Sequence, residues 1–457
     1  MSVPADPHIV SSTVTFMHAG LLAAMVAALA FEEKIHAQKS VITGVAAVFA
    51  LLLGAATHVL PESHGHVPFY IGFIDWGVIA VILGSSLFVD TATKSGIFSW
   101  LAIRITKMTA GDPLKLLVSY GVMTVIFSAL LNNVTAMIIV GSLTVVSLRK
   151  LGREKLLLGF LLCEGLLTNI GGLLTLISSV PNIIVGNTAG ISFFKFFIVS
   201  APFVTLATAV TLWMAARLFG VHALSGEEER EKAAALIETF DENDGIESRG
   251  FFIAAWIIFG LFILTLATTS VLPYIRDLGI GFVAMAFGVM FLVKVKSEAD
   301  QTYRNVDWDL LLFFCFLFIV IGVAEHAGVL GVIGNGVLKL MALGDTAGPA
   351  ALLWASSIAS SVTDNIPLAA VLAKTMSGIT DPAPLTSSSN YWWAVIYGAN
   401  LGGNITPIGS ASTLVAVTII HKNKLELSFV GFVVKAVPFA LVQLVLATIY
   451  VFILGKI

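Results

Sequence analysis

Charged residues are scarce in this sequence. Only 12% of its 457 residues are charged and 57% are hydrophobic, whereas a soluble domain carries about 25% charged residues. An ordinary water-soluble enzyme and a disordered chain are therefore excluded. Lys and Arg number 25 against 28 Asp and Glu, a net charge of −3, so the positive excess that nucleic-acid binding requires is missing too. The mean hydropathy of +0.96 indicates an integral membrane protein.

Cysteine and the common catalytic patterns are also scarce. The two cysteines, Cys163 and Cys315, lie in apolar runs and form no CxxC, so no disulfide framework or metal cluster is expected. The chain has no GxxxxGK[ST] for nucleotide phosphates, no HExxH for zinc, and no Ser–His or Cys–His pairing. We therefore expect neither ATP as the energy source nor a membrane-embedded enzyme, and no metal or cofactor.

Apolar segments long enough to cross about 30 Å of hydrocarbon, some 20 residues each, recur through the chain. The first lysine is Lys34, so the positive region of a cleavable signal peptide is missing. The predicted crossings are residues 14–31, 41–60, 74–92, 155–190 (interrupted), 196–220, 250–272, 279–295, 306–324, 391–420 (interrupted) and 429–456.

Lysine and arginine are concentrated on alternate loops. Segments 32–40, 93–113, 148–156, 221–249, 294–305 and 421–427 carry most of them, whereas 61–73, 190–195, 273–278, 341–349 and 381–390 carry almost none. By the positive-inside rule the first set is cytoplasmic, which places both termini outside.

Two further apolar stretches behave differently, because both ends of each lie on one side. Residues 114–148 are flanked by cytoplasmic charge and broken at 132–133, and residues 346–380 are flanked by outer loops and broken at 364–367. We expect two re-entrant hairpins that enter from opposite sides. Non-helical backbone at membrane depth is tolerated only where it lines a cavity or packs in protein, so the hairpin tips are candidate sites.

The two halves of the chain align at an offset of about 232 residues. Asp75 matches Asp307, residues 132–133 match 364–365, and Asn169 matches Asn400 one residue closer in register. Each half reads as two helices, a third helix, a short amphipathic segment, a hairpin, a broken helix and a final helix. Each half thus crosses the membrane an odd number of times, so the second is inverted, which is typical of secondary transporters.

We therefore predict an all-α integral membrane protein with inverted repeats, about ten transmembrane helices, two re-entrant hairpins and two broken helices. Residues 1–220 form the first repeat and 250–457 the second. The acidic segment 221–249 is expected to be a cytoplasmic, partly helical linker.

Four polar elements, the two hairpin tips and the two helix breaks, interrupt the apolar segments. Gly-Gly pairs and prolines stop the helical hydrogen-bond ladder, half-helix N-termini bring partial positive charge to the midplane, and Asn, Ser and Thr donate and accept without ionisation. Such residues also bridge membrane helices structurally, but four elements paired by a repeat favour transport of a small polar solute. The predicted solute-binding residues are Asn132, Asn133, Thr135, Asn169, Gly171, Gly172, Thr175, Asn365, Asn400, Gly402, Gly403, Asn404, Thr406 and Ser410.

Two carboxylates are the predicted proton carriers. Asp364 lies at the second tip, and its repeat partner is Asn132. A carboxylate inside the membrane is a functional candidate, with capping of the tip amides as the alternative. Glu164 lies within two turns of Asn169 and is the second candidate, with pairing to a neighbouring helix as its alternative.

These motifs resemble the ion transporter superfamily, in particular the group of ArsB arsenite exporters, NhaD sodium/proton antiporters and the melanosomal P protein. Residues 131–135 are similar to the group's first tip, 168–182 to the P-protein break, 361–367 to the second tip of NhaD and P protein, and 404–410 to ArsB. The resemblance implies a scaffold domain, about residues 11–92 and 250–324, with a homodimer as one arrangement. It also implies a mobile transport domain, about 114–190 and 346–420, that moves as an elevator.

The sequence departs from NhaD and P protein at two acidic positions. Asn132 stands where they usually have Asp, and Ser178-Ser179 stands for their Gly-Asp. Na⁺ prefers hard oxygen ligands that include charge, whereas arsenite near neutral pH is mostly the uncharged trihydroxide. We therefore expect a proton-coupled antiporter that exports arsenite or antimonite. A sodium/proton antiporter and an anion or dicarboxylate importer are the alternatives.

The expected partners are a small inorganic solute, protons and the lipid of a bacterial or archaeal inner membrane, with no nucleic acid. Similarity to ArsB adds a soluble ATPase as an alternative partner.

Overall fold

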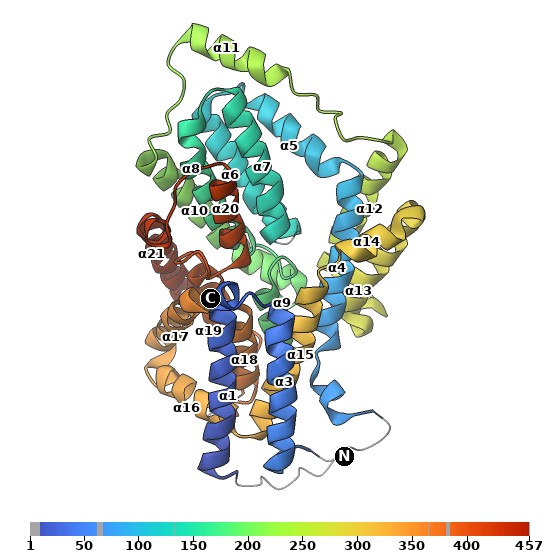
Figure 1. Ribbon diagram of the computed structural model, residues 1–457, viewed down its shortest axis with the longest axis vertical. Helices are drawn as coiled ribbons and strands as arrows, with labels where there is room; N and C mark the ends of the chain where they lie inside the picture. The colour runs from blue at the N-terminus through green and yellow to red at the C-terminus, as the bar shows by residue number, and fades with distance from the viewer. Residues whose placement is uncertain (1–9, 62–66, 132, 364, 381–383, 457) are drawn as a thin grey trace.

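The fold is all-helical, as predicted. The computed structural model describes residues 10–61, 67–131, 133–363, 365–380 and 384–456, and all regular secondary structure in them is helical (Figure 1). The predicted site residues Asn132 and Asp364 lie outside the described residues.

The first half of the chain contains every element that the repeat predicts, in the predicted order. Its helices are α1 (Ser12–Ala30), the short α2 (Glu32–Ile35), α3 (Lys39–Ala56), α4 (Trp76–Lys94), the amphipathic α5 (Ile97–Met108), the hairpin α6 (Pro113–Leu130) and α7 (Asn133–Lys150), the broken helix α8 (Leu157–Gly171) and α9 (Val180–Thr188), and the final α10 (Phe193–Leu218).

The second half follows after a segment that contains α11 (Glu227–Glu238). Its helices are α12 (Arg249–Thr268), α13 (Ile275–Leu292), the 3₁₀ turn η3 (Val293–Glu298), α14 (Ala299–Asn305), α15 (Trp308–His326), the amphipathic α16 (Val329–Met341), the hairpin α17 (Gly344–Val362) and α18 (Asn365–Ser377), the broken helix α19 (Asn390–Gly402) and α20 (Ala411–Lys422), and the final α21 (Phe429–Leu454).

Matching helices of the two repeats make matching packing contacts. Helix α4 packs on α13 as α15 packs on α3, α6 packs on α8 as α17 packs on α19, and α20 packs on α8 as α9 packs on α19. The last pair of contacts exchanges half-helices between the repeats, so the two broken helices are interlocked.

The two hairpins approach one another from opposite ends of the molecule (Figure 1). The α6/α7 hairpin comes from the end that carries α11, and the α17/α18 hairpin from the end that carries α16. The inward-pointing ends of both hairpins lie beside the breaks, because each hairpin packs on the broken helix of its own repeat.

Ten helices of the described residues are long and apolar enough to cross a membrane, the number predicted. The membership differs, however: α6 and α7 are among the ten, whereas the four half-helices α8, α9, α19 and α20 are not. At 1.5 Å per residue the 18 residues of α6 extend about 27 Å, so this hairpin reaches through most of the hydrocarbon. Each broken helix needs both halves to do the same.

The helix starts follow local chemistry that is shared by the repeats. Asp75 Oδ1 accepts from the Val78 N–H at 3.1 Å and Asp307 Oδ1 from the Leu310 N–H at 2.9 Å, so these two side chains are the N-caps of α4 and α15. Gly96 and Gly328, the matching residues before α5 and α16, both have positive φ, 82° and 76°. The chain thus turns sharply into each amphipathic helix where glycine tolerates that backbone.

Glycine also sets how closely α4 and α13 pack. A Cβ on Gly84 would lie 2.3 Å from the carbonyl carbon of Ala284, and one on Gly288 would lie 2.6 Å from the carbonyl oxygen of Gly84. Small residues let membrane helices approach at backbone distance, so this contact ties the first repeat to the second.

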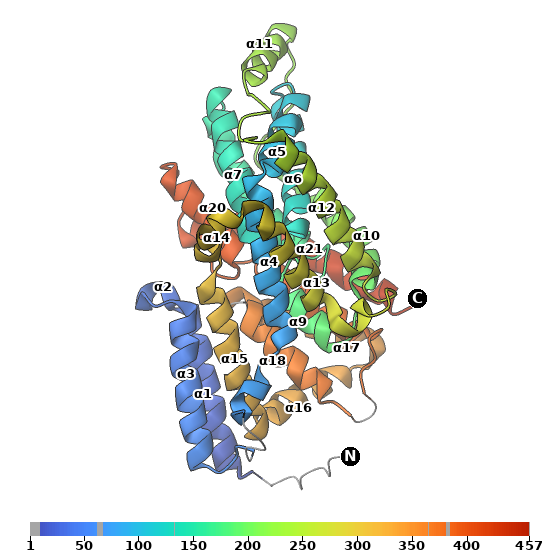
Figure 2. The same ribbon diagram turned by 90° about the vertical axis from the view of Figure 1, so that its right-hand side faces the viewer.

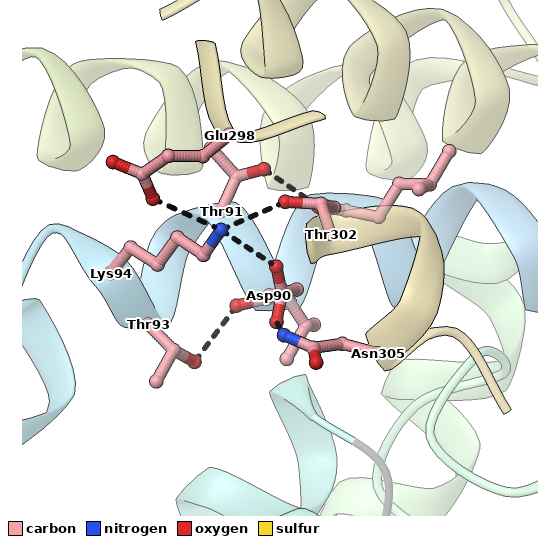
Figure 3. Close-up of polar contacts among 9 residues, drawn as sticks. Asp90, Thr91, Thr93, Lys94, Glu298, Thr302 and Asn305 are labelled. Atoms are coloured by element: carbon pink, nitrogen blue, oxygen red, sulfur yellow. Dashed lines mark hydrogen bonds and ion pairs between the residues drawn. The ribbon is translucent and has the colours of Figure 1, made fainter. Parts of the chain in front are cut away.

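The end of α4 is held to α14 by a charged cluster, drawn in Figure 3. Lys94 Nζ lies 3.0 Å from Thr302 Oγ1, 3.4 Å from Glu298 and 3.6 Å from Asp90. Asn305 Nδ2 donates to Asp90 Oδ1 at 2.8 Å. Asp90 is therefore part of an ion-paired helix end.

Candidate functional site

A hydrogen-bonded network of neutral side chains joins three of the four predicted polar elements. Asn133, the first residue of α7, donates through Nδ2 to Asn169 Oδ1 at 3.3 Å. Asn169 Nδ2 in turn donates to Asn404 Oδ1 at 2.8 Å and to Ser410 Oγ at 2.9 Å. Asn169 and Asn404 are fully buried, and Ser410 is 5% exposed. We call Asn133, Asn169, Asn404 and Ser410 the amide network.

The second break makes the mirror-image contact with the first. Ser179 Oγ donates to Asn400 Oδ1 at 2.7 Å, and Asn400 Nδ2 donates to Asn182 Oδ1 at 2.9 Å. Asn182 Nδ2 donates to the Gly172 carbonyl at 2.6 Å. Ser179 and Ser410 are the N-caps of α9 and α20. The first half-helix of each repeat, α8 or α19, is therefore hydrogen-bonded to the N-cap of the second half-helix of the other repeat.

Two of the predicted glycines pack against the hairpin arms. A Cβ on Gly171 would lie 2.6 Å from the Val125 carbonyl oxygen, and one on Gly402 would lie 2.4 Å from that of Ser357. Only glycine lets each hairpin arm lie this close to its broken helix. These two glycines therefore position the hairpins.

Two threonines anchor the hairpin arms in the same symmetric way. Thr175 Oγ1 donates to the Ala129 carbonyl at 2.6 Å, and Thr406 Oγ1 donates to the Ser361 carbonyl at 2.6 Å. These carbonyls belong to the last turns of α6 and α17, where carbonyl groups have no hydrogen-bond partner within their own helix.

Two of the remaining predicted residues, both glycines, border the network. A Cβ on Gly172 would lie 2.8 Å from Asn133 Oδ1, and one on Gly403 would lie 3.0 Å from Ser410 Cβ. Thr135 is part-buried on α7, and Asn365 is buried at the start of α18. Among the described residues, no hydrogen bond joins Asn365 to the amide network.

Side chains that sequence reasoning missed are hydrogen-bonded to the amide network. Gln443 on α21 accepts from Asn404 Nδ2 at 2.8 Å and donates to Thr211 on α10 at 3.0 Å. Ser128 Oγ lies 2.7 Å from Asn133 Oδ1. The signal that would have revealed Thr211 and Gln443 is the repeat itself, because the two residues are 232 positions apart and lie on the matching final helices α10 and α21.

A cavity of about 680 Å³ reaches the network from the direction of α2. Its wall includes Leu29 and Phe31 at the end of α1, Val134 beside Asn133, and Ser410 itself. The cavity therefore lies between α1 on one side and α7 and α20 on the other.

Two polar contacts, on the side away from this cavity, join α18 to α15 and α9 to the start of α4. Lys374 on α18 forms an ion pair with Glu325 on α15 at 3.2 Å, and Asn187 Nδ2 on α9 donates to Asp75 Oδ2 at 3.1 Å. Asp75, Glu325 and Lys374 line a smaller cavity of about 230 Å³ between them. We call these two contacts the outer bridges.

Glu164 is buried inside the helices around the first break. It is 1% exposed, and its Oε1 accepts from Thr144 Oγ1 on α7 at 2.5 Å. Its Oε2 is buried without a hydrogen-bond partner among the described residues. A carboxylate in this environment either carries a proton or bears a large desolvation cost.

Comparison with known proteins identifies the family. A family model described as a citrate transporter, CitMHS, matches residues 26–398. The chain belongs to the CitMHS family. It is thus a multi-pass membrane protein and a secondary transporter, and the predicted place in the ion transporter superfamily is confirmed.

Individual relatives match across most of the chain. Uncharacterized transporter Rv2684 of Mycobacterium tuberculosis is 30% identical over 406 residues, 88% of this chain and 92% of that protein. The P protein of Mus musculus is 23% identical over 480 residues, 89% of this chain and 57% of that protein.

A solved structure shares the fold. The YdaH transporter of Alcanivorax borkumensis matches with a TM-score of 0.58 at 12% identity, covering 97% of this chain and 98% of its own. Its structure is described as having an unusual topology. At 12% identity the match shows only that the two chains share a fold.

Proposed function

We propose that this CitMHS protein exports a small uncharged inorganic hydroxide, arsenite or antimonite as the trihydroxide, in exchange for protons. The observation that carries the proposal is the composition of the amide network at the end of the 680 Å³ cavity. Asn133, Asn169, Asn404 and Ser410 are all neutral donors or acceptors; Asn133 is part-buried and the other three are buried.

The chemistry of the solute fits such a site. Each oxygen of a trihydroxide both donates and accepts, so it replaces either role of an amide or a hydroxyl. No ion needs to be desolvated on entry, and no counter-charge is required. Tight binding by cysteine thiolates is not needed, and the two cysteines lie on different helices, Cys163 on α8 and Cys315 on α15.

Proton coupling is assigned to Glu164 and to Asp364. Glu164 supports this role because it is buried and its Oε2 is unpartnered among the described residues. It lies on α8, the half-helix that also carries Asn169, so its protonation acts on the helix that holds the solute. Asp364 is included because of its position in the sequence, at the tip of the second hairpin.

An elevator movement is the mechanism that we propose, with α1, α3, α4, α12, α13 and α15 as the scaffold. In both views α6 and α7 extend well beyond α1 and α3 toward α11 (Figures 1 and 2). The large cavity opens on the side of α2, while the outer bridges close the other side. This combination is expected of a transport domain displaced toward the cytoplasm.

The second candidate is transport of an organic anion such as citrate. It is favoured by the description of the CitMHS family model. The N-termini of α9 and α20, capped by Ser179 and Ser410, also bring partial positive charge to the breaks. A tricarboxylate, however, requires compensating cations, and the amide network contains no Lys or Arg.

The test is uptake into everted membrane vesicles, whose cytoplasmic face is outside. With the lumen acidified, we expect uptake of arsenite that stops when the pH gradient is collapsed. Sodium, citrate and citrate with Mg²⁺ are supplied in parallel. Gradient-dependent uptake of citrate without arsenite would replace our proposal by the second candidate, and sodium-dependent proton release without arsenite uptake would replace it by a sodium/proton antiporter.

A further inference from the structure

A second large cavity lies away from the amide network, in a groove between α6 and α10. Its volume is about 740 Å³, and Leu212 of α10 is among its lining residues. A Cβ on Gly121 of α6 would lie 2.4 Å from Leu212 Cδ2 of α10. The walls are aliphatic, with Val118, Val122 and Ile126 of α6 each about 40% exposed.

Charge is confined to one end of this groove. Arg217 and His222 line it where α10 ends, and no Asp or Glu is among the lining residues. Arg217 lies over the Trp213 ring at 5.6 Å from the centroid, and among the described residues it has no carboxylate partner. The end of the groove therefore presents an uncompensated cation beside an aromatic ring.

The length of the groove matches one leaflet of a bilayer. Its lining along α10 runs from Val204 to Arg217, about 20 Å at 1.5 Å per residue. Half of a hydrocarbon core of about 30 Å is about 15 Å. By the positive-inside rule the Arg217 end is cytoplasmic, and the cytoplasmic leaflet is the one that carries anionic lipid.

We propose that the groove is a binding site for an anionic phospholipid of the cytoplasmic leaflet. One acyl chain lies along Val118, Val122 and Ile126, and the headgroup phosphate accepts from the Arg217 guanidinium, whose planar fork suits a phosphate. Trp213 packs beside the guanidinium at the depth where indole rings favour the membrane interface.

A second copy of this chain fits the groove less well. A two-fold interface would bring the same surface of both copies together. Arg217 would then be buried with no lining carboxylate to compensate it. A phospholipid supplies both the apolar chain and the missing negative charge.

The experiment uses the full chain, purified in detergent and stripped of lipid. Bound lipid is counted by native mass spectrometry after addition of phosphatidylglycerol or phosphatidylcholine with identical acyl chains. We expect one tightly bound phosphatidylglycerol, preferred by about fivefold, since one basic residue near the surface contributes about 1 kcal/mol. Arg217→Gln should abolish the preference, and Ala209→Trp, at an exposed position on the groove lining, should prevent binding of both lipids.

Arg249→Gln is the matched control, because Arg249 starts α12 outside the groove, and it should keep the full preference. Equal binding of both lipids to the unmodified protein would overturn the proposal, as would an unchanged preference in Arg217→Gln. Dimers that carry no lipid and dissociate on Ala209→Trp would show that a second copy occupies the groove. None of these outcomes depends on which solute the protein transports.

Discussion

The side-chain amide of Asn169 donates to Oγ of Ser410 across 2.9 Å, although the two residues are 241 positions apart in the chain. Its repeat-related counterpart, Ser179 to Asn400, measures 2.7 Å. Each half-helix end is thus held by the other repeat. The two breaks are thus joined by two short hydrogen bonds.

Asn169→Leu should abolish transport while the protein still reaches the membrane. The substitution keeps similar volume but removes the donor to Asn404 and Ser410, and leaving buried partners unsatisfied costs about 1–3 kcal/mol. We expect uptake in everted vesicles to fall by more than about tenfold, in line with that cost. Asn243→Leu, in the exposed linker, is the control and should transport normally. Normal uptake by Asn169→Leu would remove the amide network from the solute path.

Gly171→Val and Gly402→Val should each prevent correct packing of a hairpin. The added side chain would clash with the Val125 or Ser357 carbonyl oxygen, because even a Cβ would lie only 2.6 or 2.4 Å from it, well inside van der Waals contact. Overpacking of this kind costs at least about 1–3 kcal/mol. The thermal unfolding midpoint and the yield of monodisperse protein measure the effect. Gly260→Val is the control, because nothing lies within 4 Å of a Cβ there; equal stability of all three variants would contradict the packing argument.

Joining Glu325 to Lys374 should stop transport reversibly. Both positions are replaced by Cys in a Cys315→Ser background and linked with a short, cleavable bifunctional thiol reagent. The ion pair bridges α15 and α18, which move apart in an elevator, so uptake should fall by more than about tenfold and recover on cleavage. The matched control links Glu298 to Lys94, an ion pair between elements of the scaffold (Figure 3). Full activity of the linked Glu325–Lys374 variant would exclude the movement.

The outer bridges should also bias the direction that the protein faces at rest. In the first repeat the residues that match Glu325 and Lys374 are Thr93 and Ser142, which cannot form an ion pair. Lys374→Gln is therefore expected to shift the population toward the outward-facing state, by about 0.2–1 kcal/mol for a half-exposed pair. Labelling of Ser410→Cys from the cytoplasmic side reports this shift as a slower rate. An unchanged labelling rate in Lys374→Gln would show that the pair does not hold the resting state.

Glu164→Gln should separate proton coupling from solute movement. Glutamine keeps a hydrogen bond with Thr144 but cannot carry a proton. We expect gradient-driven uptake of arsenite to be lost while exchange of labelled for unlabelled arsenite continues. Glu154→Gln, at an exposed turn before α8, should leave both activities intact. Gradient-driven uptake that survives in Glu164→Gln assigns coupling to Asp364 alone, for which Asp364→Asn is the corresponding variant.

Much of this architecture could be predicted because it depends on local or periodic properties. Helix lengths follow from apolar runs that must cross the hydrocarbon, and the caps at Asp75 and Asp307 follow from side chains that reach an amide three residues away. The break residues were found because Gly-Gly and Asn recur in both halves. The order of elements, including both hairpins, came out as predicted for the same reason.

The contacts that define the site were not predictable in this way. Nothing in the local sequence says that Asn169 bonds to Ser410, that Gln443 completes the network, or that Lys374 pairs with Glu325. These neighbours come from opposite repeats or distant helices, and their meeting depends on how two inverted bundles interlock.

The sequence by itself determined that the chain lives in a bilayer, that it is built twice, and where its helices break, because burial of apolar runs and the demands of backbone hydrogen bonding act residue by residue. Only the tertiary structure decided which amides face one another, which side of the molecule is open toward the network, and where a cation is left without a partner. Those features arise from distances between helices far apart in the chain, and such distances are set by packing of the whole bundle.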